Sequence, residues 1–189
     1  MSGFALDWEA RYREGSARWE RPGLNPAFVA WRADGTLVPC RILVPGAGRS
    51  AEPLALVEAG FEVTVVDAAE SAVGVQRARG IGDVVQADLL AWQPERPFDA
   101  IYDQTCLCAL PPGVLPEYAQ RLARWLRPGG TLFVLFMQTG REGGPPFHCD
   151  MDAMRRLFAA PLWHWPDTLP ALIPHPAGLF EQPAALRRK

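Results

Sequence analysis

A glycine-containing turn follows a short apolar run in this sequence and is suited to the close approach of a ligand. Gly46 and Gly48 flank Ala47, directly after the run at residues 41–44 and Pro45. Glycine has no Cβ, so the backbone there can approach a bound group, and a following helix would present free amide donors to it. Residues 46–51 also match the G-x-G-x-x-G/A pattern of dinucleotide-binding loops, although a simple tight turn would look the same.

Two acidic side chains follow later apolar runs and could bind the polar parts of a nucleotide. Asp67 lies 19 residues after Gly48, and a carboxylate at that point can accept hydrogen bonds from both ribose hydroxyls. It could instead cap the helix expected after it, and its two oxygens allow both roles. Asp88 could accept a hydrogen bond from an adenine amino group while Leu89 packs on the ring. The alternative for Asp88 is an exposed turn residue.

The segment after the fourth apolar run and one later histidine are the candidates for a substrate pocket. Gln104 and Thr105 follow that run directly, and Cys106 and Cys108 would share one face of an extended strand. A reactive cysteine needs an electropositive setting, which the sequence does not show, so we interpret both as pocket lining. His148 could deprotonate a thiol of ordinary pKa about 8.5, or be a surface residue beside a helix cap. The cysteines lack C-x-x-C spacing, so no metal site is predicted.

These residues need a scaffold, and alternating apolar runs and helical patterns predict one. Strands are expected over residues 41–44, 61–66, 83–87, 98–103 and 131–137, with a sixth at 162–165. Helices are expected over residues 5–13, 26–33, 50–59, 69–79, 114–126 and 150–158. Asn25 is the expected cap of the second helix, and Pro26 its first residue.

The order of these elements predicts the fold class and the place of the ligand. Strands separated by single helices pair in parallel with right-handed crossovers. The fold class is therefore α/β, a Rossmann-like, doubly wound and mostly parallel sheet with helices on both faces. In such sheets the ligand lies outside the carboxyl ends of the strands, where the strand order switches. The late prolines predict that residues 166–189 form an extended tail with little helix.

Composition excludes several classes of function. The chain of 189 residues suits one domain with a real core, and 49% hydrophobic and 21% charged residues are ordinary for a soluble globular protein. A formal net charge of −2 shows no excess of basic residues of the kind that binds nucleic acid. The apolar runs are too short to cross a bilayer, and the N-terminus lacks the layout of a secretory signal. We therefore expect a cytoplasmic protein without nucleic-acid or membrane partners.

The ordered set of motifs resembles the class I S-adenosylmethionine-dependent methyltransferases. In the common core it consists of Asp67, Asp88, the run at residues 98–103 and the Pro-Gly-Gly turn at residues 128–130. Further segments resemble the thiopurine and thiol methyltransferase branch, and most closely its thiol, halide and thiocyanate members. These segments are Trp8-Glu9-Ala10-Arg11-Tyr12, Trp19, Asn25-Pro26, residues 43–48, residues 102–110 and residues 143–147. The resemblance covers residues 5 to about 158.

The resemblance implies S-adenosyl-L-methionine as the cofactor and assigns residues to it. The residues expected to bind it are Trp8, Tyr12, Trp19, Gly46, Gly48, Asp67, Asp88, Leu89 and Gln104. The three aromatic residues would belong to an N-terminal helical lid at residues 1–35, ahead of a core at residues 40–165. Gly46 would lie beneath the methionine part, the two acids would hold ribose and adenine, and Gln104 would lie near the transferring methyl group.

The chemistry that the resemblance implies is methyl transfer to a small soft nucleophile by in-line displacement. Thiols, thiopurines, thiocyanate, halides and metalloid oxyanions are such acceptors, and a thiolate or halide needs no general base. Two other functions stay open at this point. One is an NAD(P)-dependent oxidoreductase using the Gly46-Ala47-Gly48 loop, for which 189 residues leave little room. The other is a non-catalytic cofactor-binding protein. In each case we expect a single-domain monomer with a small-molecule partner.

Overall fold

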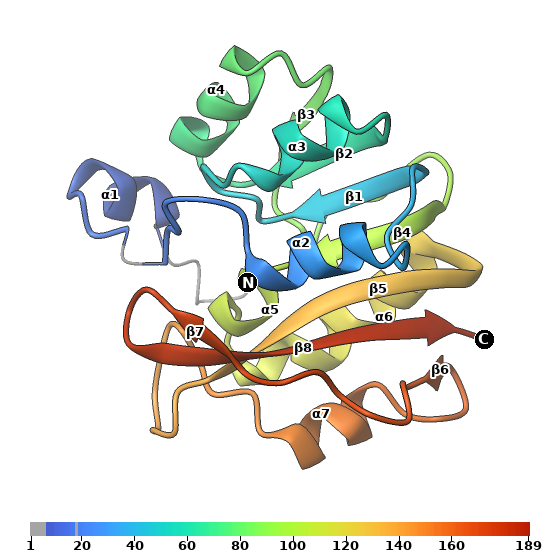
Figure 1. Ribbon diagram of the computed structural model, residues 1–189. Helices are drawn as coiled ribbons and strands as arrows, with labels where there is room; N and C mark the ends of the chain where they lie inside the picture. Colours follow the sequence, from blue (N-terminus) through green and yellow to red (C-terminus); the bar gives the residue numbers. More distant parts are fainter. Residues whose placement is uncertain (1–6, 18) are drawn as a thin grey trace.

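The computed structural model describes residues 7–17 and 19–189, and its strands form one sheet (Figure 1). The sheet has eight strands in the order β3-β2-β1-β4-β5-β8-β6, with β7 paired to β8. The strands are β1 (Arg41–Pro45), β2 (Glu62–Asp67), β3 (Asp83–Gln86), β4 (Phe98–Asp103), β5 (Leu126–Gln138), β6 (Trp163–His164), β7 (Ile173–His175) and β8 (Leu179–Arg188). The expected α/β class with a mostly parallel sheet is confirmed.

The parallel part of the sheet contains the expected switch in strand order. β1 pairs in parallel with both β2 and β4, β2 with β3, and β4 with β5. The chain thus moves outward from β1 to β3 and then returns to the other side of β1 as β4. The carboxyl ends of β1 and β4 therefore flank the crevice in which doubly wound sheets bind ligands.

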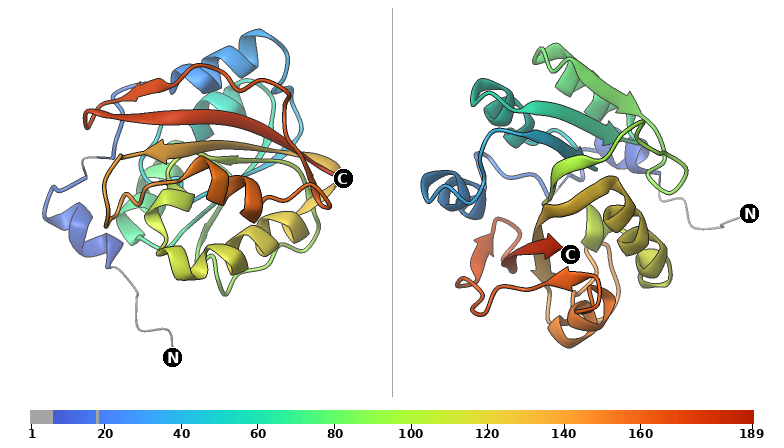
Figure 2. Two further views of the ribbon diagram at one scale, coloured as in Figure 1. Left: turned by 90° about the horizontal axis from the view of Figure 1, so that it is seen from below. Right: turned by 90° about the vertical axis from the view of Figure 1, so that its right-hand side faces the viewer.

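Helices cover both faces of the sheet, as its buried and apolar strands require. They are α1 (Trp8–Arg13), α2 (Pro26–Ala33), α3 (Glu52–Glu58), α4 (Glu70–Ala78), α5 (Cys106–Ala109), α6 (Leu115–Trp125) and α7 (Met151–Leu157). One core cluster joins α2 and α3 to the sheet, and the other joins α5, α6 and α7 to the opposite face. Figure 2 shows α2 and α6 on opposite sides of the sheet, and Figure 1 shows α1 near the carboxyl end of β1.

Local sequence signals explain the best-predicted helices. The Asn25 side chain accepts a hydrogen bond from the Ala27 amide at 2.9 Å and caps α2, with Pro26 in the first turn. Tyr118, Leu122 and Trp125 recur on one face of α6 and are all buried. Both helices match the expected boundaries within a residue of each end, because cap and apolar spacing agree.

The Pro-rich tail at residues 166–189 was expected to be extended with little helix, and the structure has a long strand there. β8 pairs antiparallel with β5 from Thr131–Arg187 to Gln138–Phe180, so the tail completes the sheet. Pro183 lies between the stretches of β8 that pair with β7 and with β6. At that point β5 is the only neighbour among the described strands, so a proline is tolerated as at an edge. The prolines had obscured a strand that pairing with β5 makes possible.

The segment after β4 also differs from the expectation. Cys106 and Cys108 lie in the short helix α5 and not on a strand, and both are buried. The carboxylate of Asp103, the last residue of β4, accepts hydrogen bonds from the amides of Cys106 and Leu107, both at 3.1 Å. These bonds favour a helical turn directly after β4 over continued strand. Across residues 7–17 and 19–189, no helix has the length and apolar character needed to cross a membrane.

Candidate active site

The turn after β1 has the backbone conformation that only glycine adopts without strain. Gly46 and Gly48 have φ of +54° and +55°. A Cβ on Gly46 would lie 2.9 Å from Cys106 Sγ, and one on Gly48 would lie 2.6 Å from the Tyr12 hydroxyl oxygen. Side chains thus approach the loop backbone more closely than any other residue would permit. The expected close approach of a ligand to this backbone stays a prediction.

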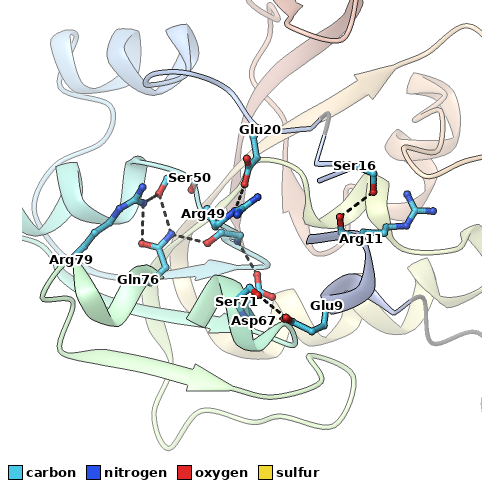
Figure 3. Close-up of polar contacts among 11 residues, drawn as sticks. Glu9, Arg11, Ser16, Glu20, Arg49, Ser50, Asp67, Ser71, Gln76 and Arg79 are labelled. Carbon is cyan, nitrogen blue, oxygen red and sulfur yellow. Dashed lines mark hydrogen bonds and ion pairs between the residues drawn. The ribbon is translucent and has the colours of Figure 1, made fainter. Parts of the chain in front are cut away.

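A buried glutamine fixes the carbonyls of this loop, and sequence reasoning did not single it out. Gln76 on α4 has no exposed surface, and its Nε2 donates to the Gly48 carbonyl at 2.8 Å and to the Ser50 carbonyl at 3.0 Å. Arg79 also donates to the Ser50 carbonyl (Figure 3). The loop amides of Gly46 and Gly48 donate elsewhere, to the Val66 carbonyl and to the Asp67 carboxylate. Gln76 follows Ala72 by four residues, so both side chains lie on the same face of α4. This spacing could have identified Gln76 as buried.

Asp67 lies at the end of β2, next to the glycine turn. Its Oδ2 accepts from the Gly48 amide at 2.8 Å and its Oδ1 from the Ala69 amide at 2.9 Å. It does not cap α4, whose N-cap is Ala69. Burial raises the pKa of Asp67, and the amides of Ala69 and Gly48 oppose that shift. Each oxygen keeps a further lone pair, so the carboxylate can still accept from ribose hydroxyls.

Asp88 and Leu89 follow β3 on the same edge of the sheet but differ in exposure. Asp88 is exposed, and its Oδ1 accepts from the Leu90 amide at 2.8 Å, which closes a tight turn. Leu89 is 9% exposed and packs into the core cluster beneath β4 and β5. The adenine role of both residues stays a prediction.

Trp8, Tyr12 and Trp19 gather into one aromatic cluster over the glycine turn. The Trp19 ring makes edge contacts with Trp8 and with Tyr12, each at 5.5 Å between centroids. Tyr12 is buried, and burial raises its pKa to about 12. The Arg49 guanidinium lies 4.5 Å from the centre of the Tyr12 ring. The structure brings all three aromatics together at the predicted place, and their role as a lid stays a prediction.

Two ion-pair and hydrogen-bond contacts fasten this N-terminal segment to the core, and neither was predicted. The Glu9 carboxylate accepts from the Ser71 hydroxyl at 2.6 Å and from the Ser71 amide at 2.8 Å. Glu20 pairs with Arg49 of the glycine loop at 2.6 Å. Figure 3 shows the two carboxylates reaching α4 and the loop from the N-terminal segment. The Glu20–Arg49 ion pair is partly exposed and therefore weak.

At the end of β4 lie the Gln104 amide group, which can donate, and the Asp103 carboxyl group, whose two oxygens both accept hydrogen bonds within the protein. Tyr102 donates its hydroxyl to Gln104 Oε1 at 2.8 Å, which leaves the Gln104 NH₂ group as a donor. Tyr118 donates to Asp103 at 2.8 Å, and burial raises the pKa of Asp103 to about 6. Thr105 is half-buried and precedes α5 without a side-chain cap. Gln104 and Thr105 thus lie together at the switch point.

The cysteines near this point are thiols and not thiolates. Burial raises the pKa of Cys106 and of Cys108 well above the usual value, and the Asp103 carboxylate adds to the shift of both. This agrees with their interpretation as lining residues. Among the described residues, no three His, Cys, Asp or Glu side chains gather in a way that could hold a metal ion.

His148 lies on the loop after β5, at the rim of a cavity. Its Nδ1 accepts from the backbone amides of Thr139 and Gly140, at 3.1 and 3.4 Å. The cavity has a volume of about 470 Å³. It is lined by Pro112, Gly140, Arg141, Glu142, Gly143, Phe147 and His148. The lining of this cavity includes neither Gln104 nor the glycine turn.

A buried polar cluster joins the N-terminal segment to α3 and β8. Arg21 pairs with Glu181 at 2.9 Å, and Asn25 Nδ2 donates to the same Glu181 oxygen at 2.9 Å. The Asn25 amide donates to Glu52 at 2.8 Å. Burial raises the pKa of both carboxyl groups, and nearby Arg21 opposes the shift. No sequence signal marked this cluster, because Glu181 alone resembles an exposed strand residue.

The sequence is similar to known proteins of one family. The sequence model of the thiopurine S-methyltransferase family matches residues 5–81 and 74–167. A probable thiol methyltransferase 2 of Arabidopsis thaliana is 30% identical over 158 residues, 79% of this chain and 70% of that protein. A thiopurine S-methyltransferase of Legionella pneumophila (strain Corby) is 31% identical over 163 residues, 74% of each chain.

A solved structure shows the same fold at lower identity. It is the 1,6-didemethyltoxoflavin-N1-methyltransferase of Burkholderia thailandensis, with bound 1,6-didemethyltoxoflavin and S-adenosylhomocysteine. The TM-score is 0.74 at 23% identity, covering 95% of this chain and 84% of that one. The family match decides between the methyltransferase and oxidoreductase interpretations of the glycine loop. This chain belongs to the thiopurine S-methyltransferase family, a branch of the class I S-adenosylmethionine-dependent methyltransferases.

Proposed function

We propose that this enzyme transfers the methyl group of S-adenosylmethionine to a small, soft nucleophile, with a thiol or thiocyanate as the best acceptor. The observation that carries the proposal is the lack of a usable base at the switch point within the described chain. Asp103 is sealed by Tyr118 and two backbone amides, and the His148 Nδ1 accepts backbone amides. Oxygen and nitrogen acceptors usually need a positioned base, whereas thiolates and thiocyanate do not.

The residues around the glycine turn fit the cofactor. Gly46 and Gly48 keep a Cβ-free backbone, and Asp67 retains acceptor capacity for two hydroxyl groups. We assign ribose binding to Asp67, and adenine binding to Asp88 with Leu89. When bound, S-adenosylmethionine would supply a methyl group on a positive sulfonium; the acceptor would attack the methyl carbon in line, and the neutral thioether would leave.

The chain's own contribution is alignment and exclusion of water. Trp8, Tyr12 and Trp19 cover the glycine turn, so they would keep a bound cofactor out of solvent. Both reacting charges shrink in the transition state, so a dry aromatic site favours the reaction. Gln104 presents its NH₂ group beside the site and would orient an anionic acceptor. Alignment of this kind can supply on the order of 7–11 kcal/mol.

A panel of acceptors tests the proposal directly. The enzyme would be given S-adenosylmethionine with thiophenol, thiocyanate, iodide, phenol and aniline, and methylated products quantified by mass spectrometry. We expect thiophenol or thiocyanate to exceed phenol and aniline in kcat/KM. Faster methylation of phenol or aniline than of every thiol would refute the assignment. A thermal shift with S-adenosylhomocysteine, set against NADH, separately tests the cofactor, since a tight ligand raises the melting temperature.

A further inference from the structure

The Asp103 carboxylate closes the turn that carries Gln104 and Thr105. Its Oδ1 accepts hydrogen bonds from the amides of Cys106 and Leu107, both at 3.1 Å. Gln104 and Thr105 are therefore held between the end of β4 and the first turn of α5. Asp103 has no exposed surface, so water does not compete for these bonds. The carboxylate thus fixes the backbone of the two predicted pocket residues, which we call the acceptor turn.

The first residue of α5 also contacts the glycine turn after β1. A Cβ on Gly46 would lie 2.9 Å from the Sγ atom of Cys106 and 3.0 Å from its Cβ. The Cys106 side chain therefore lies directly against Gly46, whose amide donates to the Val66 carbonyl of β2 at 2.8 Å. Gly46 is thus held between β2 and α5. Because the interior is close-packed, a shift of Cys106 would move the glycine turn.

One hydroxyl group on α6 is bonded to both of these residues. The Tyr118 hydroxyl donates to Asp103 Oδ2 at 2.8 Å and is also a hydrogen-bond partner of the Cys106 thiol. Tyr118 has no exposed surface, and its ring makes an edge contact with Trp125 at 6.3 Å between centroids. The hydroxyl therefore has a fixed place in the core. It connects the residue that closes the acceptor turn to the residue that contacts the glycine turn.

We propose that Tyr118 is a positioning residue for methyl transfer, which acts through Asp103 and Cys106 to hold the acceptor turn and the glycine turn at a fixed separation. The inference rests on the proposed function and assigns to it a residue in the core beneath the site. In-line displacement needs the attacking atom, the methyl carbon and the sulfonium sulfur in one line. A misplacement of about 1 Å can cost about 100-fold in rate.

The buried carboxylate has a second possible role, which two ligands can distinguish from positioning. The Asp103 carboxylate could attract the positive sulfonium of S-adenosylmethionine. S-adenosylhomocysteine has a neutral thioether at the same place and would not feel this attraction. A loss of positioning should therefore weaken both ligands alike, whereas a loss of charge attraction should weaken S-adenosylmethionine alone.

Four variants separate positioning from charge and from stability. Tyr118→Phe removes only the hydroxyl, and Asp103→Ala removes the acceptor of the α5 amides. Asp103→Asn keeps an oxygen for those amides and an NH₂ group that can donate to the Tyr118 oxygen, so it preserves the geometry and removes the charge. Leu122→Ala is the control for lost stability. Leu122 is buried one turn after Tyr118 on α6 and makes none of these side-chain hydrogen bonds.

The measurements are calorimetry with S-adenosylhomocysteine and with S-adenosylmethionine, and kcat/KM for thiophenol at saturating S-adenosylmethionine. We expect Tyr118→Phe and Asp103→Ala to weaken both ligands about 3- to 10-fold and to lower kcat/KM about 10- to 100-fold. Asp103→Asn should stay within about threefold of wild type in all three measurements. Leu122→Ala should leave them unchanged, although urea unfolding should show its lower stability.

Wild-type binding and turnover in folded Tyr118→Phe would overturn the proposal, even if Asp103→Ala does not fold. An equal loss of kcat/KM in Leu122→Ala would reduce the effect to general destabilisation and refute the positioning role. Weaker S-adenosylmethionine binding with unchanged S-adenosylhomocysteine binding in Asp103→Asn would assign a charge role instead. Ligand binding needs no acceptor. If wild type binds both ligands yet methylates no soft nucleophile, the proposed function fails, and the two calorimetric measurements still decide the positioning role.

Discussion

The contact between Tyr12 and Gly48 allows a direct test of whether the N-terminal segment rests on the cofactor loop. A Cβ added at Gly48 would lie 2.6 Å from the Tyr12 hydroxyl oxygen and 3.9 Å from Tyr12 Cζ. Gly48→Ala therefore clashes with a single atom. Tyr12→Phe removes that atom and leaves only ordinary van der Waals contact. Tyr12 cannot simply swing aside, because it is buried against Trp19 and Arg49.

The expected effect has two parts that a control can separate. A left-handed backbone costs an alanine roughly 1–2 kcal/mol, and overpacking adds roughly 1–3 kcal/mol. Gly80 also has a positive φ, of +81°, with nothing within 4 Å of an added Cβ. Gly80→Ala should therefore show the first part alone. Gly48→Ala should show both parts in wild type, and only the first in the Tyr12→Phe background.

The assay is the free energy of opening of the N-terminal segment. Native-state trypsin cleavage at the exposed Arg13 reports it when opening is faster than cleavage. The four proteins of the Gly48–Tyr12 cycle should give a coupling energy of roughly 1–3 kcal/mol. Urea unfolding of the same proteins and of Gly80→Ala measures the backbone part, because the left-handed strain persists while the segment is open; the opening free energy reports the clash alone. Equal cost of Gly48→Ala in both backgrounds would show that Tyr12 does not rest on the loop.

Four further substitutions test the site and its surroundings. Asp67→Ala should weaken S-adenosylhomocysteine binding by roughly 2–4 kcal/mol in calorimetry, and an unchanged dissociation constant would remove its ribose role. Burial raises the pKa of Asp103 from 3.8 to about 6, so its folded form binds the proton more tightly and stability falls as pH rises through that window. Asp103→Asn should abolish roughly 3 kcal/mol of that fall between pH 4 and pH 7 in urea unfolding; an unchanged pH profile would contradict it. Arg21→Ala leaves Glu181 buried without its cation and should cost roughly 3–5 kcal/mol, whereas Arg121→Ala breaks a half-exposed pair and should cost under about 1 kcal/mol. Equal losses in the last two would mean that the buried pair is not the stronger contact.

The order of elements could be predicted from sequence because each signal was local. The strand over residues 98–103 was expected at its observed bounds, and α2 and α6 lie within a residue of theirs. Caps, apolar spacing and glycine stops act within a few residues, so the sequence shows them directly. The parallel topology and its switch point then followed from the alternation of strand and helix. That was enough to place the glycine turn and Asp67 at one edge.

Elements that depend on distant partners could not be predicted in the same way. β8 contains Pro183 and Glu181, both unfavourable in an isolated strand, and it forms because β5 offers a full antiparallel partner. α5 forms because the Asp103 carboxylate accepts its first amides. In each case the local pattern favoured loop or strand. The tertiary partner, invisible in sequence, decided the outcome.

The same limit explains the residues missed at the site, and it shows how the N-terminal segment is attached. Glu181 is acceptable in the core only because Arg21 and Asn25, more than 150 residues earlier, neutralise and solvate it. Both partners belong to the stretch that links the aromatic cluster to α2. Glu9 and Glu20, by contrast, attach the cluster through partly exposed pairs, which are weak. The strong buried contacts thus hold the base of the segment on β8 and α3, while weak contacts hold its tip on α4 and the glycine loop. We therefore predict that this segment can leave the cofactor loop without unfolding the sheet.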